Sequence, residues 1–142
     1  MMKEQYAEMY NIVGAAMEVY NTLGRGMEEA VYQEAMQIEM ALRDISFERE
    51  VWFDAFYKDC KMKKRYRADL VVNDVIVELK SVCCLTSDHR AQLFNYMRLT
   101  KQKRGILMNF GGRSFAAERY WYREETDDFV LLKKDNYEEY VE

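Results

Sequence analysis

Three charged residues, Asp69, Glu78 and Lys80, have the types and the spacing of a divalent-metal site with a lysine beside it. They lie in the segment 66–82, YRADLVVNDVIVELKSV, where two arms rich in Val, Ile and Leu flank the pair Asn73-Asp74. Such arms around a turn signal predict two strands joined by a tight turn. Hard divalent cations prefer oxygen ligands, so the chemistry depends on whether the two acids meet.

The turn determines which residues of the two arms face each other. Counting outward from a two-residue turn places Asp69 opposite Glu78, and Arg67 opposite Lys80. Directly opposed residues point to the same side of a sheet, with Cβ atoms about 4.5–5.5 Å apart. One face of the hairpin is therefore predicted to carry all four charges. The other face is predicted to be core: Ala68, Leu70, Val72, Val75, Val77 and Leu79.

Apolar residues on both faces of the hairpin predict that it is covered on both sides. Carboxylates on a covered face are costly unless they are paired or bind a metal. Two interpretations therefore remain open at the level of the residues alone. One is a pair of cross-strand salt bridges, and the other is a metal site that has Lys80 as a neighbour.

Composition limits the class of protein. A length of 142 residues predicts a single domain over 1–142 with a substantial hydrophobic core. No apolar run approaches the length of a membrane-spanning helix and no signal-peptide pattern opens the chain, so no membrane partner is expected. Three cysteines without a CxxC spacing and a single histidine argue against a zinc site and favour a cytoplasmic location.

The net charge of −4 is unevenly distributed. Residues 115–142 contain nine acidic and four basic residues, so the rest of the chain is close to neutral. Segment 58–67 contains six basic residues and one acidic residue, and segment 98–104 contains four basic residues and no acidic one. Such runs are usually solvated surface and less often bind phosphates, and both meanings remain open here.

The hydrophobic pattern predicts three helices, over 4–23, 27–43 and from Thr86 to about Leu99. Strands are expected over 46–57, in both arms of the hairpin and over 104–110, with a polar turn over 58–64. The third helix can be a right-handed crossover that makes strands 75–82 and 104–110 parallel. Two more strands, 119–123 and 129–132, are expected in a C-terminal β extension (about 115–142) after a core of about 5–114.

Five short motifs occur in an order that is typical of one known family. They are Gly26-Met27-Glu28-Glu29-Ala30-Val31-Tyr32, Tyr66-Arg67-Ala68-Asp69, Val77-Glu78-Leu79-Lys80, Ala91-Gln92-Leu93-Phe94-Asn95-Tyr96 and Asn109-Phe110-Gly111. Over about residues 5–120 the set resembles the GxxExxY protein family within the PD-(D/E)XK nuclease-like superfamily. The resemblance implies a mixed α/β, restriction-endonuclease-like core, with a central four-stranded mixed sheet that contains the antiparallel hairpin and is flanked by helices.

The resemblance also implies an activity, the hydrolysis of phosphodiester bonds in DNA or RNA with Mg²⁺ or Mn²⁺ as the cofactor. The implied metal ligands are the carboxylates of Asp69 and Glu78 and the backbone carbonyl of Leu79. Glu29, from the second helix, is implied as an additional ligand.

Two further side chains have roles implied by the resemblance. Lys80 is expected to orient the attacking water or to neutralise charge in the transition state. Gln92, from the helix packed over the site, is expected to position the water or Lys80.

Two other functions compete with a nuclease. One is a non-catalytic module that keeps the fold and binds nucleic acid or protein, and the presence of Asp69, Glu78 and Lys80 speaks against it. The other is an assembly protein, because the aromatic run Tyr120-Trp121-Tyr122 would pair with a second copy if it formed an exposed strand edge. A homodimer through the C-terminal extension is therefore a further expectation.

Overall fold

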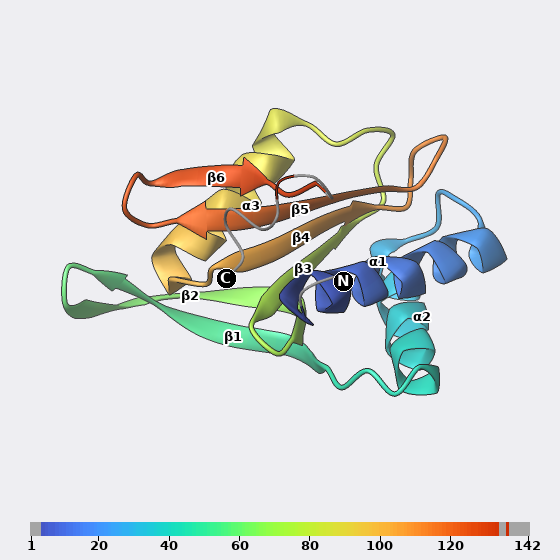
Figure 1. Cartoon of the computed structure of the whole chain (residues 1–142), viewed down its shortest axis with the longest axis horizontal. Helices are drawn as coiled ribbons and strands as arrows, with labels where there is room; N and C mark the ends of the chain where they lie inside the picture. The colour runs from blue at the N-terminus through green and yellow to red at the C-terminus, as the bar shows by residue number, and fades with distance from the viewer. Residues whose placement is uncertain (1–3, 134–135, 137–142) are drawn as a thin grey trace.

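The fold is seen in a computed structural model that describes residues 4–133 and residue 136. Three helices and six strands follow one another along the described part of the chain in the predicted order (Figure 1). Their bounds are α1 Glu4–Leu23, α2 Glu29–Leu42, β1 Glu48–Tyr57, β2 Cys60–Val72, β3 Val75–Lys80, α3 Ser87–Thr100, β4 Arg104–Asn109, β5 Ala116–Arg123 and β6 Asp128–Leu131. No helix in this described part of the chain is long and apolar enough to cross a membrane.

All six strands form a single mixed sheet in the order β1-β2-β3-β4-β5-β6. Strands β3 and β4 are parallel because α3 connects them as a crossover, and every other neighbouring pair is antiparallel. The mixed α/β class is thus confirmed, but the sheet has six strands rather than four plus an extension. The predicted C-terminal strands β5 and β6 continue the central sheet.

This topology corrects the expectation for Tyr120-Trp121-Tyr122. The run lies in β5, which pairs with β4 on one side and β6 on the other, so it is not a sheet edge. Tyr120 and Tyr122 are buried beneath α3. The reason for expecting a homodimer through this run is therefore removed.

Each face of the sheet buries its own hydrophobic core. Helices α1 and α2 cover one face, and α3 covers the other. Helix α1 presents Met9, Ile12 and Val19 at helical spacing to its core, whereas α3 contributes Leu93 and Met97. The sheet is consequently covered on both sides, as the apolar hairpin predicted.

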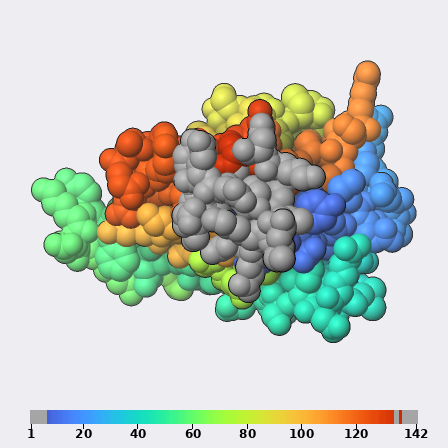
Figure 2. All heavy atoms as spheres, viewed as in Figure 1, coloured from blue at the N-terminus to red at the C-terminus, as the bar shows by residue number. Residues whose placement is uncertain are grey.

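The outer parts of strands β1 and β2 form a two-stranded arm, defined here as residues 51–67. Its base packs against the core under α3 through Val51 and Phe53, whereas its tip, residues 56–65, is exposed. The predicted polar turn over 58–64 was wrong, because the turn contains only Lys58 and Asp59 and β2 begins at Cys60. Exposed lysines do not prevent strand pairing. Across the arm, Asp54 forms salt bridges with Lys61 at 3.4 Å and Arg65 at 3.5 Å. The arm projects from the left of the molecule in Figures 1 and 2.

Candidate active site

The β2–β3 turn has the predicted register. Pairing runs from Val72 opposite Val75 to Leu70 opposite Val77. Asn73 opens the turn with a φ of 54°, in the left-handed region that asparagine tolerates better than most residues. The sequence-based count is therefore confirmed as far as Leu70.

Beyond Leu70 the backbone pairing between β2 and β3 ends, and a side chain makes the next hydrogen bond between the two strands. The backbone N–H of Leu79 donates to Oδ2 of Asp69 at 2.9 Å. The alternation of faces along β2 also breaks here, because Ala68 and Val71 belong to the core under α3 whereas Leu70 belongs to the opposite core. The prediction that Ala68 shares a face with Leu70 was thus wrong, and Asp69, at the break, is held against β3.

The carboxyl group of Glu78 lies next to that of Asp69. Glu78 is only 7% exposed, and no polar group of the described residues forms a hydrogen bond with its Oε1. Burial raises the pKa of Glu78 well above its ordinary value, and the charge of Asp69 and a hydrogen bond with its side chain raise it further. The charge of Lys80 acts in the opposite direction but has the weaker effect, so the positive charge near the two carboxyl groups is insufficient to neutralise both.

Lys80 is held by a chain of polar groups from α3. Its Nζ donates to Oε1 of Gln92 at 3.2 Å, and Nε2 of Gln92 donates to the hydroxyl of Tyr96 at 3.1 Å. The Tyr96 ring packs against Tyr66 with centroids 4.6 Å apart. Burial, and after it the charge of Glu78, raise the pKa of Tyr96.

Arg67 is not part of this cluster, although the extended count of the hairpin predicted it there. Strands β2 and β3 are no longer paired at this point, whereas β2 remains paired with β1 on its other side, where Arg67 lies opposite Trp52. The Arg67 guanidinium lies over the Trp52 ring, 5.8 Å from its centroid. The divergence of β2 from β3 is the physical reason for the error.

Glu29 is the first residue of α2 and is half-buried. The hydroxyl of Ser81 donates to the carbonyl of Met27 at 2.5 Å, so the start of α2 lies close to the chain just after Lys80. Over residues 4–133 and 136, however, no group of three His, Cys, Asp or Glu side chains is arranged to hold a metal ion. The role of Glu29 as an additional ligand stays a prediction.

Tyr32, the last residue of the Gly26–Tyr32 motif, stabilises the loop that precedes α2. Its hydroxyl donates to the carbonyl of Gly24 at 2.6 Å and accepts from the N–H of Met27 at 3.1 Å. Its ring stacks on Phe110 with centroids 4.4 Å apart. The tyrosine of the motif therefore has an architectural role and does not reach the carboxyl pair through these bonds.

Asn109 is a residue whose role sequence reasoning missed. At the end of β4 it accepts the N–H groups of Val82 and Gly111, at 3.0 and 3.1 Å, and its amide donates to the carbonyl of Val82 at 2.9 Å. A Cβ atom on Gly111 would overlap the backbone of Val82. These contacts fix the segment that follows Lys80, and the motif Asn109-Phe110-Gly111 was the available signal.

A second acidic residue under α3 was also missed. Glu118 lies in the same row of the sheet as Glu78, with Leu107 of β4 paired to both. Arg90 of α3 forms a two-pronged ion pair with Glu118, at 2.7 and 2.8 Å, and this pair lowers the pKa of Glu118. No local sequence signal reveals this pair, because it depends on the register between β4 and β5.

A groove of about 410 Å³ lies beside the candidate site, between the base of the arm and α3. Its lining includes Lys64 and Tyr66 from β2 and Gln92 and Tyr96 from α3. Gln92 forms a hydrogen bond with Lys80, and Tyr96 forms one with Gln92. The groove thus links the arm to the lysine of the site.

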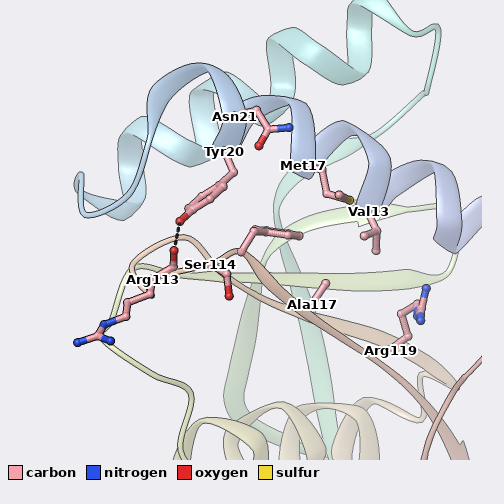
Figure 3. Close-up of a pocket in the computed structure, with 9 residues that line it drawn as sticks. Val13, Met17, Tyr20, Asn21, Arg113, Ser114, Ala117 and Arg119 are labelled. Carbon is pink, nitrogen blue, oxygen red and sulfur yellow. Dashed lines mark hydrogen bonds between the residues drawn. The ribbon is translucent and has the colours of Figure 1, made fainter.

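A larger hollow of about 490 Å³ lies on the other face of the sheet (Figure 3). It is lined by α1 residues such as Val13 and Met17 and by β5 residues such as Ala117. The hydroxyl of Tyr20 donates to the carbonyl of Arg113 at 3.2 Å at its rim. None of the predicted site residues lines this hollow, so it is separate from the carboxyl pair.

The residues at the carboxyl pair fit a hard divalent cation. Asp69 and Glu78 supply carboxylate oxygens, and one of these, Oε1 of Glu78, is buried without a hydrogen-bond partner among the described residues. A buried carboxylate without a partner is costly, and a cation removes that cost by supplying the missing positive charge. Without a cation, the pair is relieved by protonation of Glu78, in agreement with its raised pKa, whereas Glu118 is neutralised by Arg90.

Comparison with solved structures identifies a protein with a similar fold. A solved structure, that of the protein SSO0001, is similar with a TM-score of 0.50 and 18% sequence identity, over 63% of this chain and 48% of that chain. At this identity the similarity shows a shared fold, and this chain matches about half the length of that protein. No curated protein sequence matches the chain.

A sequence model of the PD-(D/E)XK nuclease superfamily matches residues 6–121. The matched region extends from α1 into β5, and it contains the Asp69 and Glu78 carboxyl pair, Lys80 and the helix that carries Gln92. Because the match covers most of the chain and this centre, the chain belongs to the PD-(D/E)XK nuclease superfamily.

Proposed function

We propose that this protein is a nuclease that hydrolyses phosphodiester bonds in DNA or RNA with Mg²⁺ or Mn²⁺ as its cofactor. The observation that carries the proposal is the buried Oε1 of Glu78, which has no hydrogen-bond partner among the described residues and lies beside Asp69. Membership of the superfamily supports a nucleic-acid substrate. The five ordered motifs support placement in its GxxExxY group.

In the proposed site, Asp69, Glu78 and the backbone carbonyl of Leu79 hold the cation, with Glu29 as an additional ligand. Mg²⁺ retains several waters, so a few protein oxygens are sufficient to hold it. When bound, such a cation polarises a phosphoryl oxygen and lowers the pKa of water. Asp69 also accepts the N–H of Leu79, which orients its carboxylate before any ligand arrives.

Lys80 supplies the positive charge that this chain itself brings to the reaction. Its ammonium group stabilises the negative charge that develops on the phosphoryl oxygens, or orients the attacking water. Gln92 accepts one of its N–H groups and is in turn held by Tyr96, so the ammonium group is positioned before substrate binds. Positioning in advance matters because charge stabilisation is strongest where no reorganisation is needed.

The cellular location that we propose is the cytoplasm. Cys60, Cys83 and Cys84 are exposed and form no disulfide. Free exposed thiols persist where the environment is reducing.

The test is a cleavage assay on single- and double-stranded DNA and RNA with Mg²⁺, with Mn²⁺ and with EDTA. We expect cleavage of at least one substrate with either metal, none in EDTA, and none by Glu78→Ala. Glu118→Ala is the matched control, because it removes a carboxylate from the same row of the sheet without touching the pair. Binding without cleavage in any metal would favour the non-catalytic module instead.

A further inference from the structure

The arm, residues 51–67, carries a charge opposite to that of the chain as a whole. It contains six basic and two acidic residues, whereas the whole chain has a net charge of −4. One of the two acids, Asp54, is already bridged by Lys61 and Arg65. Lys63 and Lys64 are exposed and form no salt bridge with any residue that the structure describes, and Nζ of Lys64 lies 5.6 Å from the centroid of the Tyr66 ring. A polyanion is the partner that such a surface complements.

The arm also exposes large aromatic side chains among these cations. Trp52 is 52% exposed, Phe56 44% and Tyr57 65%. The guanidinium of Arg65 lies 5.2 Å from the centroid of the Trp52 ring, and Nζ of Lys58 lies 5.6 Å from that of Tyr57. Exposed rings interleaved with cations are the combination with which proteins stack bases and follow a phosphate backbone.

We propose that the arm binds single-stranded nucleic acid and guides it to the candidate active site. This inference rests on the proposed function, since it names the strandedness of the substrate and the surface that grips it. A duplex hides the faces of its bases within the stack, so the exposed rings of Phe56 and Tyr57 have no flat surface to meet there. A single strand presents its bases to them.

The groove beside the site provides the path from the arm to the chemistry. Lys64 and Tyr66 of the arm line it on one side, and Gln92 and Tyr96 line it on the other. Gln92 contacts Lys80 directly. A strand that is held by the tip of the arm and enters this groove therefore reaches Gln92, the side chain that contacts Lys80.

The first experiment measures equilibrium binding in EDTA, where the proposed cleavage cannot occur. The probes are a fluorescein-labelled oligo-deoxythymidine and a labelled DNA hairpin duplex of the same length. We expect Lys63→Glu/Lys64→Glu to weaken binding of the single strand at least about tenfold and to reduce the salt slope by about 0.7 for each lost phosphate contact. Arg43→Glu/Lys133→Glu makes the same change in net charge away from the arm, and we expect it to change binding less than about threefold.

The second experiment separates stacking from charge. We expect Tyr57→Ala to weaken single-strand binding about fivefold or more, while Tyr57→Phe binds like the wild type because it keeps the ring. Bound single strand should quench tryptophan emission, and Trp52→Phe should remove most of that quenching. Tyr57 and Trp52 lie outside the two cores, so neither change threatens folding.

Each result decides the proposal. Selective loss of single-strand binding in the arm variants supports it, even if no cleavage is ever found, because binding in EDTA does not depend on the metal site. Equal losses for duplex and single strand, or single-strand binding that the arm variants leave unchanged, would overturn it. Wild-type protein that binds neither probe would overturn it as well.

Discussion

Two glutamates lie in one row of the sheet beneath the same helix, and their ion pairing and pKa shifts are opposite. Glu78 on β3 and Glu118 on β5 are separated by Leu107 of β4. Glu118 receives a two-pronged ion pair from Arg90, and its pKa is lowered. Glu78 has an oxygen with no hydrogen-bond partner in the described part of the chain, and its pKa is raised, mainly because it is buried and next to Asp69.

The difference shows that the missing charge at Glu78 is a local property and does not result from being under α3. The same helix provides Arg90 to one glutamate, whereas near the other it provides Gln92, a neutral side chain that holds Lys80. An arginine at both places would make two structural ion pairs. The chain instead keeps one acidic pair under-neutralised, which favours a site for an external cation over a salt bridge.

The largest expected effect comes from replacing the basic side chain near each glutamate, Lys80 near Glu78 and Arg90 at Glu118. Lys80→Met should lower the rate of cleavage by about 100-fold or more, because the loss of a preorganised charge at the reacting group typically costs that much. Arg90→Met removes the partner of Glu118 and should leave the rate within about threefold once its lower stability is allowed for. Initial rates under saturating metal measure both.

A comparable loss of cleavage rate in both variants would contradict the different roles assigned to Glu78 and Glu118. It would mean that the whole row of the sheet under α3 serves the chemistry. Circular dichroism of both variants at the assay temperature excludes unfolding as the cause.

The next effect concerns metal and stability. Millimolar Mg²⁺ or Mn²⁺ should raise the free energy of unfolding by on the order of 1–3 kcal/mol if the Kd is tens of micromolar to sub-millimolar. Glu78→Ala should abolish this shift, and Glu118→Ala should retain it. Thermal melts with and without metal make the comparison, and equal shifts in wild type and Glu78→Ala would place the metal elsewhere, for example on the acidic residues after 115.

The two glutamates should also have opposite effects on stability as the pH changes in EDTA. The pKa of Glu118 is lowered, so its contribution is present above its ordinary pKa of 4.5 and is lost as the pH falls through the lowered value. Glu118→Gln should therefore cost up to about 1 kcal/mol near pH 7 and little in acid, since the ion pair is partly exposed.

The pKa of Glu78 is raised, so the sign is reversed. Stability from its protonated form is complete below pH 4.5 and is lost as the pH rises through the higher folded-state pKa. Glu78→Gln should thus be more stable than wild type near neutral pH in EDTA, with the gain vanishing in acid. Urea unfolding across the pH range measures both variants, and parallel curves would refute the assignment.

The smallest effect is expected at Gln92. Gln92→Ala removes one hydrogen bond to Lys80 and one to Tyr96, so cleavage should fall by about 2- to 10-fold, as expected for bonds worth about 0.5–1.5 kcal/mol. The effect should lie in the catalytic rate at saturating substrate, since Gln92 acts through Lys80. A fall as large as that of Lys80→Met would show that Gln92 has a direct role.

The carboxyl pair was predictable because it depends on local information. The turn at Asn73-Asp74 determines the register of the two strands that it joins, and Asp69 and Glu78 are only a few residues away from it. Arg67 lies two residues further out, where β2 has left β3 and pairs with β1. Where a ladder ends depends on the other neighbours of each strand, so counting along the hairpin could not locate that point.

Other features depend on contacts between residues distant in sequence. The Arg90–Glu118 pair requires the register between β4 and β5, which no turn signal determines. Whether the aromatic run in β5 is a strand edge depends on the position of β6, which pairs with β5 beyond it. The length of the arm was missed for a different reason, since the lysines of 58–64 resemble a loop in composition although their backbone pairs across the hairpin.

The clasp formed by Asn109 and Gly111 has a consequence for how such proteins diverge. It fixes the chain after Lys80 through backbone contacts and touches neither carboxylate through the bonds that it makes. A duplicated copy of this gene that lost Glu78 would still need the clasp in order to fold. Descendants would then share the asparagine and the glycine whether or not they cut nucleic acid, so sorting active from inactive lineages requires inspection of the two acids and the lysine.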